Sequence, residues 1–310
     1  MTPKVIAPAT AALPVAHASA RRPALLGEYW ELTKPRLSFL SVLTAVVGYL
    51  VARPERNFTV LLCLLAGTTC AAFGAGVLNQ WIEREIDTRM ARTRGRPLPA
   101  GTVAPGAALA FGLVLATLGP ALLWWGANAL AAGLAVATLA SYLFVYTPLK
   151  RRTPWCTVVG SIPGALPPLI GAAAAAGTIR PLGWMLFGVL FTWQIPHFLA
   201  LAWTYRRDYA GAGLPMSTVV DPSGRRAARD TLLFTFALVA CSLLPVAFGL
   251  AGPAYGLVAL AAGAWFGRRA WDFARPGARG RDLPARRLFL ASIAYLPLLL
   301  SVLVADRLWR

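Results

Sequence analysis

Long stretches without a charged residue follow one another along most of the chain. These stretches cover residues 37–52, 57–82, 97–149, 153–179, 181–205, 231–267 and 288–305. Since a helix needs about 20 apolar residues to cross a bilayer, the stretches 97–149 and 231–267 are each long enough for two helices. The pattern predicts an all-α, multi-pass transmembrane bundle of about nine helices around a central cavity. The expected helices cover residues 36–53, 59–79, 106–125, 128–147, 157–176, 181–203, 231–250, 253–271 and 287–304.

Composition agrees with this pattern and excludes an ordinary soluble domain. Hydrophobic residues make up 57% of the chain and charged residues only 14%. A net charge of +18 is also typical of nucleic-acid-binding proteins, but its distribution favours another explanation. With nine spans and an inner N-terminus, 25 of the 30 Lys and Arg residues lie on the inner side, as the positive-inside rule expects. We therefore expect a lipid bilayer and no nucleic acid as partner, and a bacterial cell (inner) membrane protein with a cytoplasmic N-terminus.

Two parts of the chain differ in composition. Residues 1–30 are rich in Ala and Pro and lack a continuous apolar core, which predicts a disordered tail on the inner side rather than a secretory signal. A mitochondrial transit segment is a weaker alternative because basic residues are few. Residues 31–310 form the predicted transmembrane domain. The four cysteines are scattered without a CxxC pair, so we interpret them as small apolar residues.

Three oxygen-bearing side chains at the end of the second predicted helix carry the first sign of chemistry. Asn79, Glu83 and Asp87 are four residues apart, so a helix places them on one face. Two carboxylates and an amide oxygen suit Mg²⁺ bridged to a phosphate group. The alternative is a solvated helix end with ordinary salt bridges. Because the C-terminal end of a helix disfavours carboxylates, these residues need cations nearby, and this requirement favours the metal site.

Two basic clusters on the same side of the membrane could supply such cations. Five arginines accompany the acidic stretch, at positions 84, 89, 92, 94 and 96. Residues 150–152, Lys-Arg-Arg, end the fourth predicted helix. The cluster at 150–152 is either a stop-transfer signal or a binding site for diphosphate oxygens, for which Lys and Arg are both good donors.

The fifth and sixth predicted helices contain further unusual residues. Residues 158–171 include three prolines and three glycines, which predicts a broken helix. Such a helix lines a cavity or packs closely through its glycines. His197 is either a packing residue or contacts a polar substrate or an iron atom. Asp208 follows the sixth helix much as the acidic residues follow the second, which suggests a faint internal duplication.

These motifs together resemble a known family. The stretch 79–101 is similar to the signature of the intramembrane UbiA-type prenyltransferases, and most closely to that of the protohaem IX farnesyltransferases (haem O synthases). Residues 146–152, 160–171 and 193–209 also resemble this family in the same order, and the resemblance covers about residues 25–305. The matching signature residues are Asn79, Glu83, Ile86, Asp87, Met90, Arg92, Thr93, Arg96 and Gly101.

The chain departs from the wider superfamily at two positions. Glu83 stands where the superfamily usually has Asp, so the carboxylate has a longer arm. The second acidic motif of the superfamily has two Asp four apart, but here Thr204 stands four residues before Asp208. The number of Mg²⁺ ions therefore stays open.

The resemblance implies a reaction and a set of roles. It implies transfer of a farnesyl group from farnesyl diphosphate to a vinyl group of protohaem IX (haem b), with addition of water, to make haem O. It implies Mg²⁺ as cofactor, and haem A synthase or a terminal oxidase assembly as partners. The implied catalytic and metal-binding residues are Asn79, Glu83, Asp87 and Asp208. The implied diphosphate-binding residues are Arg92, Arg96, Lys150 and Arg151, and the candidate haem-binding residues are His197 and Trp193.

Two alternatives remain at this point. One is a UbiA-type prenyltransferase that acts on a quinone precursor or a chlorophyllide. The other, from a different class, is a multi-pass transporter that uses the broken fifth helix as a gate. The polar residues at 79–87 fit a transporter less well, because they lie at the membrane interface rather than at the midplane.

Overall fold

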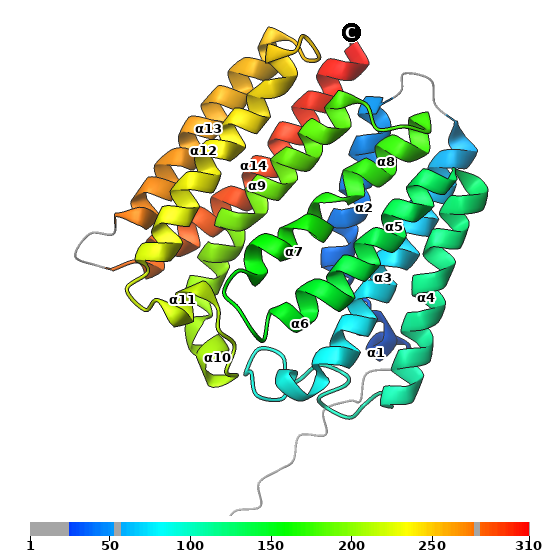
Figure 1. Cartoon of the computed structure of the whole chain (residues 1–310), viewed down its shortest axis with the longest axis vertical. Helices are drawn as coiled ribbons and strands as arrows, with labels where there is room; N and C mark the ends of the chain where they lie inside the picture. Colours follow the sequence, from blue (N-terminus) through cyan, green and yellow to red (C-terminus); the bar gives the residue numbers. More distant parts are fainter. Residues whose placement is uncertain (1–24, 53–56, 276–279, 310) are drawn as a thin grey trace, which may run out of the picture.

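The computed structural model describes residues 25–52, 57–275 and 280–309, and every regular element in these ranges is helical (Figure 1). The helices are α1 (Leu25–Leu32), α2 (Pro35–Ala52), α3 (Phe58–Asp87), α4 (Pro105–Gly126), α5 (Ala129–Ala140), the π-helix η1 (Ser141–Tyr146), α6 (Thr147–Leu149), α7 (Cys156–Ala165), α8 (Pro167–Ala176), α9 (Pro181–Thr204), α10 (Arg206–Gly211), α11 (Ser217–Val220), α12 (Arg225–Ala247), α13 (Pro253–Ala274) and α14 (Asp282–Trp309).

The predicted transmembrane helix bundle is confirmed. Within the described ranges, eight helical segments are long and apolar enough to cross a membrane. The other predicted span, residues 253–271, corresponds to α13, which has 22 residues but carries Arg268, Arg269 and Asp272 near its end. Several helices extend beyond their apolar runs, and α3 continues to Asp87 instead of ending at residue 79. Backbone hydrogen bonds continue where hydropathy falls, so bounds taken from apolar runs are too short.

The helices pack in two groups that lie side by side. In Figure 1, α3, α4 and α5 lie together on one side, and α12 and α13 on the other, with α9 and α14 beside them. The short helices α1, α6, α10 and α11 all lie at the lower end of the bundle in this view. We call this end the site end, because the polar residues of α3 reach it.

Helix α1 begins within the segment that was predicted to be a disordered N-terminal tail. Residues 25–30 were expected in the tail but are helical, and the rest of that prediction, residues 1–24, lies outside the described residues. Tyr29 packs edge-on against Phe111 with ring centroids 5.2 Å apart. The Thr102 hydroxyl donates a hydrogen bond of 2.7 Å to the Glu28 carboxylate. These contacts with the start of α4 hold α1 against the bundle.

Glycines allow α2 and α8 to approach each other very closely. A Cβ atom on Gly48 would lie 2.0 Å from the Pro168 carbonyl oxygen, and one on Gly171 would lie 1.8 Å from the Ala45 carbonyl oxygen. Membrane helices gain little from the hydrophobic effect between them, so close van der Waals packing of this kind contributes much of their association.

The break predicted within residues 158–171 is also confirmed. Helix α7 ends and α8 begins around Leu166, directly before Pro167. Proline removes a backbone donor and leaves carbonyl groups that need other partners. The Gln194 side chain ties the broken helix to α9, since its Nε2 donates to the Ser161 carbonyl oxygen at 3.2 Å. A Cβ on Gly164 would lie 1.9 Å from Gln194 Oε1, so the glycine is required for this contact.

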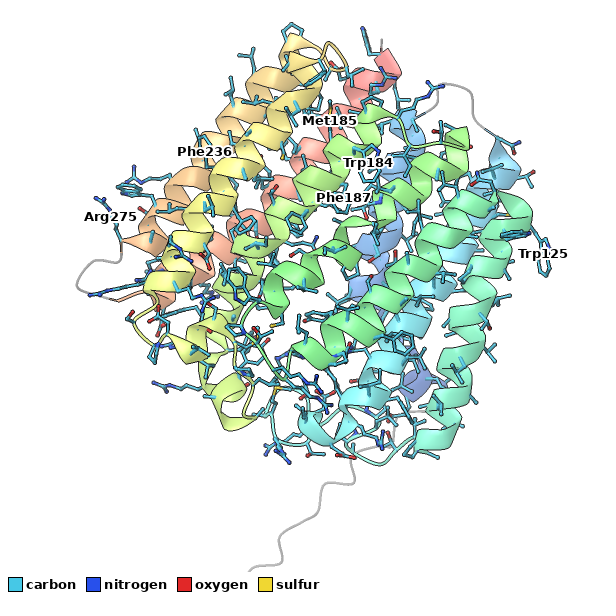
Figure 2. The ribbon with its side chains drawn as sticks, viewed as in Figure 1. Trp125, Trp184, Met185, Phe187, Phe236 and Arg275 are labelled. Atoms are coloured by element: carbon cyan, nitrogen blue, oxygen red, sulfur yellow. The ribbon has the colours of Figure 1, made fainter. Side chains whose placement is uncertain are left out.

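The lateral surface of the bundle is apolar, as a surface that faces lipid should be. Figure 2 shows Trp125 and Phe236 pointing away from the helices on opposite flanks, and they are 81% and 78% exposed. In contrast, Met185 on α9 is only 8% exposed and packs in the core of the α9, α12 and α14 group. Large apolar side chains thus lie on the outer surface as well as in the core, which agrees with a bilayer as solvent.

The close contact between α2 and α8 leads to a stability prediction. Gly171→Ala should lower the unfolding free energy by about 1–3 kcal/mol, because the added methyl group overlaps a backbone carbonyl. Gly133→Ala is the matched control, since this helical glycine of α5 has no atom within 4 Å of the added Cβ. Unfolding of the detergent-solubilised proteins by heat or by SDS measures the difference. Equal stability of the two variants would contradict the prediction.

Candidate active site

The last turns of α3 carry the three predicted polar side chains on one face. Asn79, Glu83 and Asp87 lie on a single continuous helix, and their exposed fractions are only 2%, 4% and 1%. They are therefore buried rather than solvated. We call these three residues the oxygen ladder.

One cation contacts each residue of the oxygen ladder, and the three cations come from three different parts of the chain. They belong to the corner between α1 and α2, the loop between α3 and α4, and the end of α6. The contacts join Lys34 Nζ to Asn79 Oδ1 at 2.7 Å, Lys150 Nζ to Glu83 Oε1 at 3.0 Å, and Arg96 Nη1 to Asp87 Oδ2 at 2.7 Å. The cations that the acidic end of α3 requires are thus present.

Burial makes these ion pairs important for the fold. Removal of one partner from a buried pair typically costs about 3–5 kcal/mol, because an uncompensated charge remains. Burial by itself would lower the pKa of Lys150, but the Glu83 carboxylate outweighs it and raises that pKa above its ordinary value. Lys150 is therefore charged at neutral pH and holds the Glu83 side chain in place.

Lys34 is a site residue that the sequence analysis missed. It is the only described residue other than glycine with a positive φ, at 50°. This left-handed conformation costs an L-residue about 1–2 kcal/mol. Burial first, and then the nearby Arg96 guanidinium, lower the pKa of Lys34 to about 7. The signal in the sequence is a lysine before Pro35 at the end of a span, but its contact with Asn79, 45 residues later, cannot be predicted from it.

An irregular helix forms another side of the site. The predicted helix over 128–147 changes into the π-helix η1 before α6 begins. Asn79 Nδ2 donates to Thr147 Oγ1 at 3.3 Å, and Thr147 in turn donates to the Tyr142 carbonyl oxygen at 2.8 Å. These bonds turn the Asn79 amide oxygen towards Lys34. π-Helical turns are frequent at functional sites, where they re-aim side chains.

Two aromatic rings of η1 lie next to this hydrogen-bond chain. Tyr142 and Tyr146 stack with ring centroids 5.5 Å apart. A Cβ on Gly160 of α7 would lie 2.5 Å from the Tyr146 ring, so the glycine makes room for it. The glycine-rich helix therefore serves the site by letting an aromatic side chain pack against its backbone.

Asp208 lies in α10, and the structure does not bring it into contact with the oxygen ladder. A cluster of buried side chains joins α10 to the loop after α3; it contains Met90, Cys156, Tyr209, Leu214 and Met216. In the described part of the chain, the Asp208 carboxylate has no ion-pair or side-chain hydrogen-bond partner. Among the described residues no three His, Cys, Asp or Glu side chains are grouped together, so the oxygen ladder itself offers a metal ion two carboxylates and one amide oxygen. The role of Asp208 stays a prediction.

The four predicted diphosphate-binding cations divide into two pairs. Lys150 and Arg96 contact the oxygen ladder directly. Arg151 is exposed and donates to the Ile82 carbonyl oxygen at 3.0 Å, one residue before Glu83. Arg92 is exposed and lies over the Tyr205 ring at 5.3 Å. These two arginines flank the buried site and could reach an anion without breaking a buried pair.

The two candidate haem-binding residues face α14 from α9. His197 Nδ1 lies 2.7 Å from Ser292 Oγ, and its ring stacks on Trp193 with centroids 4.8 Å apart. Trp193 is buried, and its Nε1 donates to the Ser292 carbonyl oxygen at 2.9 Å. Both side chains thus have packing contacts. Among the described residues, His197 Nε2 has no hydrogen-bond partner, so one ring nitrogen of the imidazole is available to a ligand.

This geometry suits a divalent cation with a diphosphate. Asp87 Oδ1 is buried without a hydrogen-bond partner in the described structure. The oxygens of Asn79 and Glu83 already attract ammonium groups, which occupy positions that a metal ion can take. Such hard oxygens match the ligand preference of Mg²⁺, and the neighbouring Lys and Arg side chains match that of phosphate oxygens.

Comparison with known proteins agrees with this chemistry. A protein from Opitutus terrae named protoheme IX farnesyltransferase is 50% identical over 286 residues, which cover 92% of this chain and 96% of the relative. A protein of the same name from Solibacter usitatus is 45% identical over 290 residues, covering 90% and 98% of the two chains.

Solved structures share the fold at much lower identity. A digeranylgeranylglyceryl phosphate synthase has a TM-score of 0.78 with 17% identity and covers 92% of this chain and 99% of its own. A UbiA homologue from Archaeoglobus fulgidus bound to GPP and Mg²⁺ has a TM-score of 0.66 with 15% identity, covering 89% and 99%. Residues 41–293, which include the oxygen ladder and its partners Lys150 and Arg96, match the UbiA prenyltransferase family, and the chain belongs to that family.

Proposed function

We propose that this membrane prenyltransferase transfers a farnesyl group from farnesyl diphosphate to a vinyl group of protohaem IX, with addition of water, and thereby makes haem O for terminal oxidases. The observation that carries the proposal is the oxygen ladder, where buried carboxylate and amide oxygens lie beside three basic side chains. The choice of donor and acceptor is supported by relatives at 40–50% identity that carry the name protoheme IX farnesyltransferase.

The diphosphate of the donor would bind at the oxygen ladder. Asn79, Glu83 and Asp87 would hold Mg²⁺, with Asp208 of α10 as a further ligand. The unpartnered Asp87 Oδ1 supports this assignment. Bound Mg²⁺ supplies positive charge that neutralises the diphosphate. The Archaeoglobus fulgidus homologue with bound GPP and Mg²⁺ supports the same pairing of metal and prenyl diphosphate.

The residues of the chain then assist the departure of diphosphate. Lys150 and Arg96 stabilise the negative charge that grows on the diphosphate as the allylic C–O bond breaks, and Arg92 and Arg151 add to it from the flanks. Because the Glu83 and Asp87 carboxylates hold Lys150 and Arg96 before substrate binds, little reorganisation is needed. Preorganised charge of this kind is usually the largest contribution to catalysis.

The second half of the reaction joins the farnesyl carbon to haem. The terminal carbon of the vinyl group attacks the allylic cation and forms a C–C bond. The new cation, next to the porphyrin, is captured by water, which loses a proton and leaves a hydroxyethylfarnesyl group. The protein orients the two substrates and controls where water enters. His197 would ligate the haem iron through Nε2, with Trp193 packed against the imidazole.

The proposal also includes the location of the protein and the proteins that receive its product. The chain is a multi-pass membrane protein. The excess of basic residues at the site end supports an inner-membrane location with a cytoplasmic N-terminus and a cytoplasmic active site. Haem A synthase or the terminal oxidase assembly would receive the product.

The two alternatives fit the observations less well. Membership of a prenyltransferase family and relatives that all carry a transferase name favour an enzyme over a transporter. A quinone precursor or a chlorophyllide as acceptor is favoured by no contact in the described structure, and it becomes an outcome of the assay below.

The purified full-length protein in detergent should convert haem b and farnesyl diphosphate into a product heavier by one farnesyl group and one water. Mass spectrometry detects the product, and a chelator should abolish it because the diphosphate then lacks its metal. Prenylation of an aromatic acid instead of haem would assign the chain to another branch of its family. No transfer to any acceptor would contradict the proposed function.

Asp87→Asn should lower turnover at least about 100-fold, because the charge that holds the metal is lost while Asn can still accept the Arg96 hydrogen bond. Glu85→Gln is the matched control: this acidic residue of the same helix end has an 83% exposed side chain. It should keep normal turnover. Near-normal activity of Asp87→Asn in a folded protein would remove the metal-bridge mechanism.

His197→Ala should weaken haem b binding and alter the absorption spectrum of the bound haem, because an iron ligand is lost. The Phe236→Leu exchange, at a residue of α12 that is 78% exposed, should leave the spectrum unchanged. Titration of each protein with haem b, followed by absorbance, makes the comparison. If His197→Ala binds haem normally with an unchanged spectrum, His197 is a packing residue.

A further inference from the structure

The corner between α1 and α2 holds Lys34 in a conformation that lysine seldom adopts. Its φ of 50° is the only positive value at a non-glycine residue among the described residues. The following Pro35 restricts the conformations of residue 34 further. Strained residues persist only where the surrounding structure fixes them, and they cluster at functional sites.

Several hydrogen bonds fix this corner on α3. Gln80 Nε2 donates to the Leu32 carbonyl oxygen at 2.7 Å, one residue after Asn79 on the same helix. Ser38 Oγ donates to the Thr33 carbonyl oxygen at 2.9 Å. A Cβ on Gly76 would lie 3.0 Å from that same oxygen, so α3 passes directly beneath the corner. The position of Lys34 relative to the oxygen ladder is therefore rigidly determined.

Among the described residues, no carboxylate pairs with Lys34. Its Nζ contacts the neutral amide oxygen of Asn79 at 2.7 Å, whereas Glu83 is paired with Lys150 and Asp87 with Arg96. Three partly exposed basic side chains thus surround two buried carboxylates. Lysine and arginine side chains grouped in this way are good donors to the oxygens of a phosphate group.

We propose that Lys34 binds the substrate diphosphate directly. Its ammonium group donates to Asn79 Oδ1 in the free protein and would donate to a non-bridging oxygen of the bound diphosphate, while Asn79 would help to hold the metal. This inference rests on the proposed function and adds a substrate-binding residue to it.

The left-handed backbone of Lys34 allows an experiment in which stability and binding change in opposite directions. Asn tolerates positive φ better than Lys does, so Lys34→Asn should relieve strain and also remove a half-buried basic group. We expect this variant to melt at the same or a higher temperature than the unaltered protein. Lys34→Gly should behave in the same way, which provides a second neutral variant.

The probe is inorganic pyrophosphate with Mg²⁺, titrated calorimetrically into the full chain in detergent. Lys34→Asn and Lys34→Gly should weaken pyrophosphate binding at least about tenfold and raise the KM for farnesyl diphosphate, with little change in the KM for haem b. Arg36→Met is the matched control, because this exposed residue carries the same charge two positions later. It should bind pyrophosphate normally.

The outcomes separate this inference from the proposed function. If Lys34→Asn is folded and binds pyrophosphate as tightly as the unaltered protein, while Asp87→Asn does not, Lys34 has only a structural role and the inference is wrong. If the unaltered protein itself binds no pyrophosphate with Mg²⁺, the proposed function fails instead. A loss of stability in Lys34→Asn without a loss of binding would also overturn the inference.

Discussion

Two carboxylates buried at the C-terminal end of a membrane helix are the constraint on which the site end of the bundle depends. Neither the helix dipole nor the surrounding apolar side chains can stabilise them, so each needs a cation. Those cations come from the α3–α4 loop and from the end of α6, and the α1–α2 corner adds a third beside Asn79. One electrostatic requirement therefore ties together segments that hydrophobic packing alone would leave loosely connected.

The close glycine contacts elsewhere in the bundle also help to position the residues of the site. Gly48 and Gly171 bring α2 against α8, while Gly164 leaves room for the Gln194 side chain that joins α9 to the broken helix. Because α2 begins directly after Lys34, its depth in the bundle decides where the corner lies. Packing through small residues thus fixes the positions of the helices, and these positions bring the charged side chains of the site together.

Much of this structure could be predicted from the sequence, and the reasons for the failures are physical. Apolar runs gave the spans, and the four-residue spacing put Asn79, Glu83 and Asp87 on one helix face. The partners Lys34 and Thr147 were not predicted, because their contacts with Asn79 join residues 45 and 68 positions apart. Nothing in local sequence specifies a positive φ at a lysine. The contribution of Asp208 remains a prediction, since that carboxylate does not contact the ladder.

The π-helix η1 has a consequence for how the chain can vary in length. Hydrogen bonds in a π-helix span five residues instead of four, so η1 holds about one residue more than an α-helix that turns through the same angle. A deletion in α5 would rotate Lys150 by about 100° relative to Glu83. A single deletion within residues 141–146 could instead convert η1 into an α-helix and leave Lys150 directed at Glu83. The number of residues in α5 is therefore strongly constrained, and η1 is where this segment can change its length by one residue.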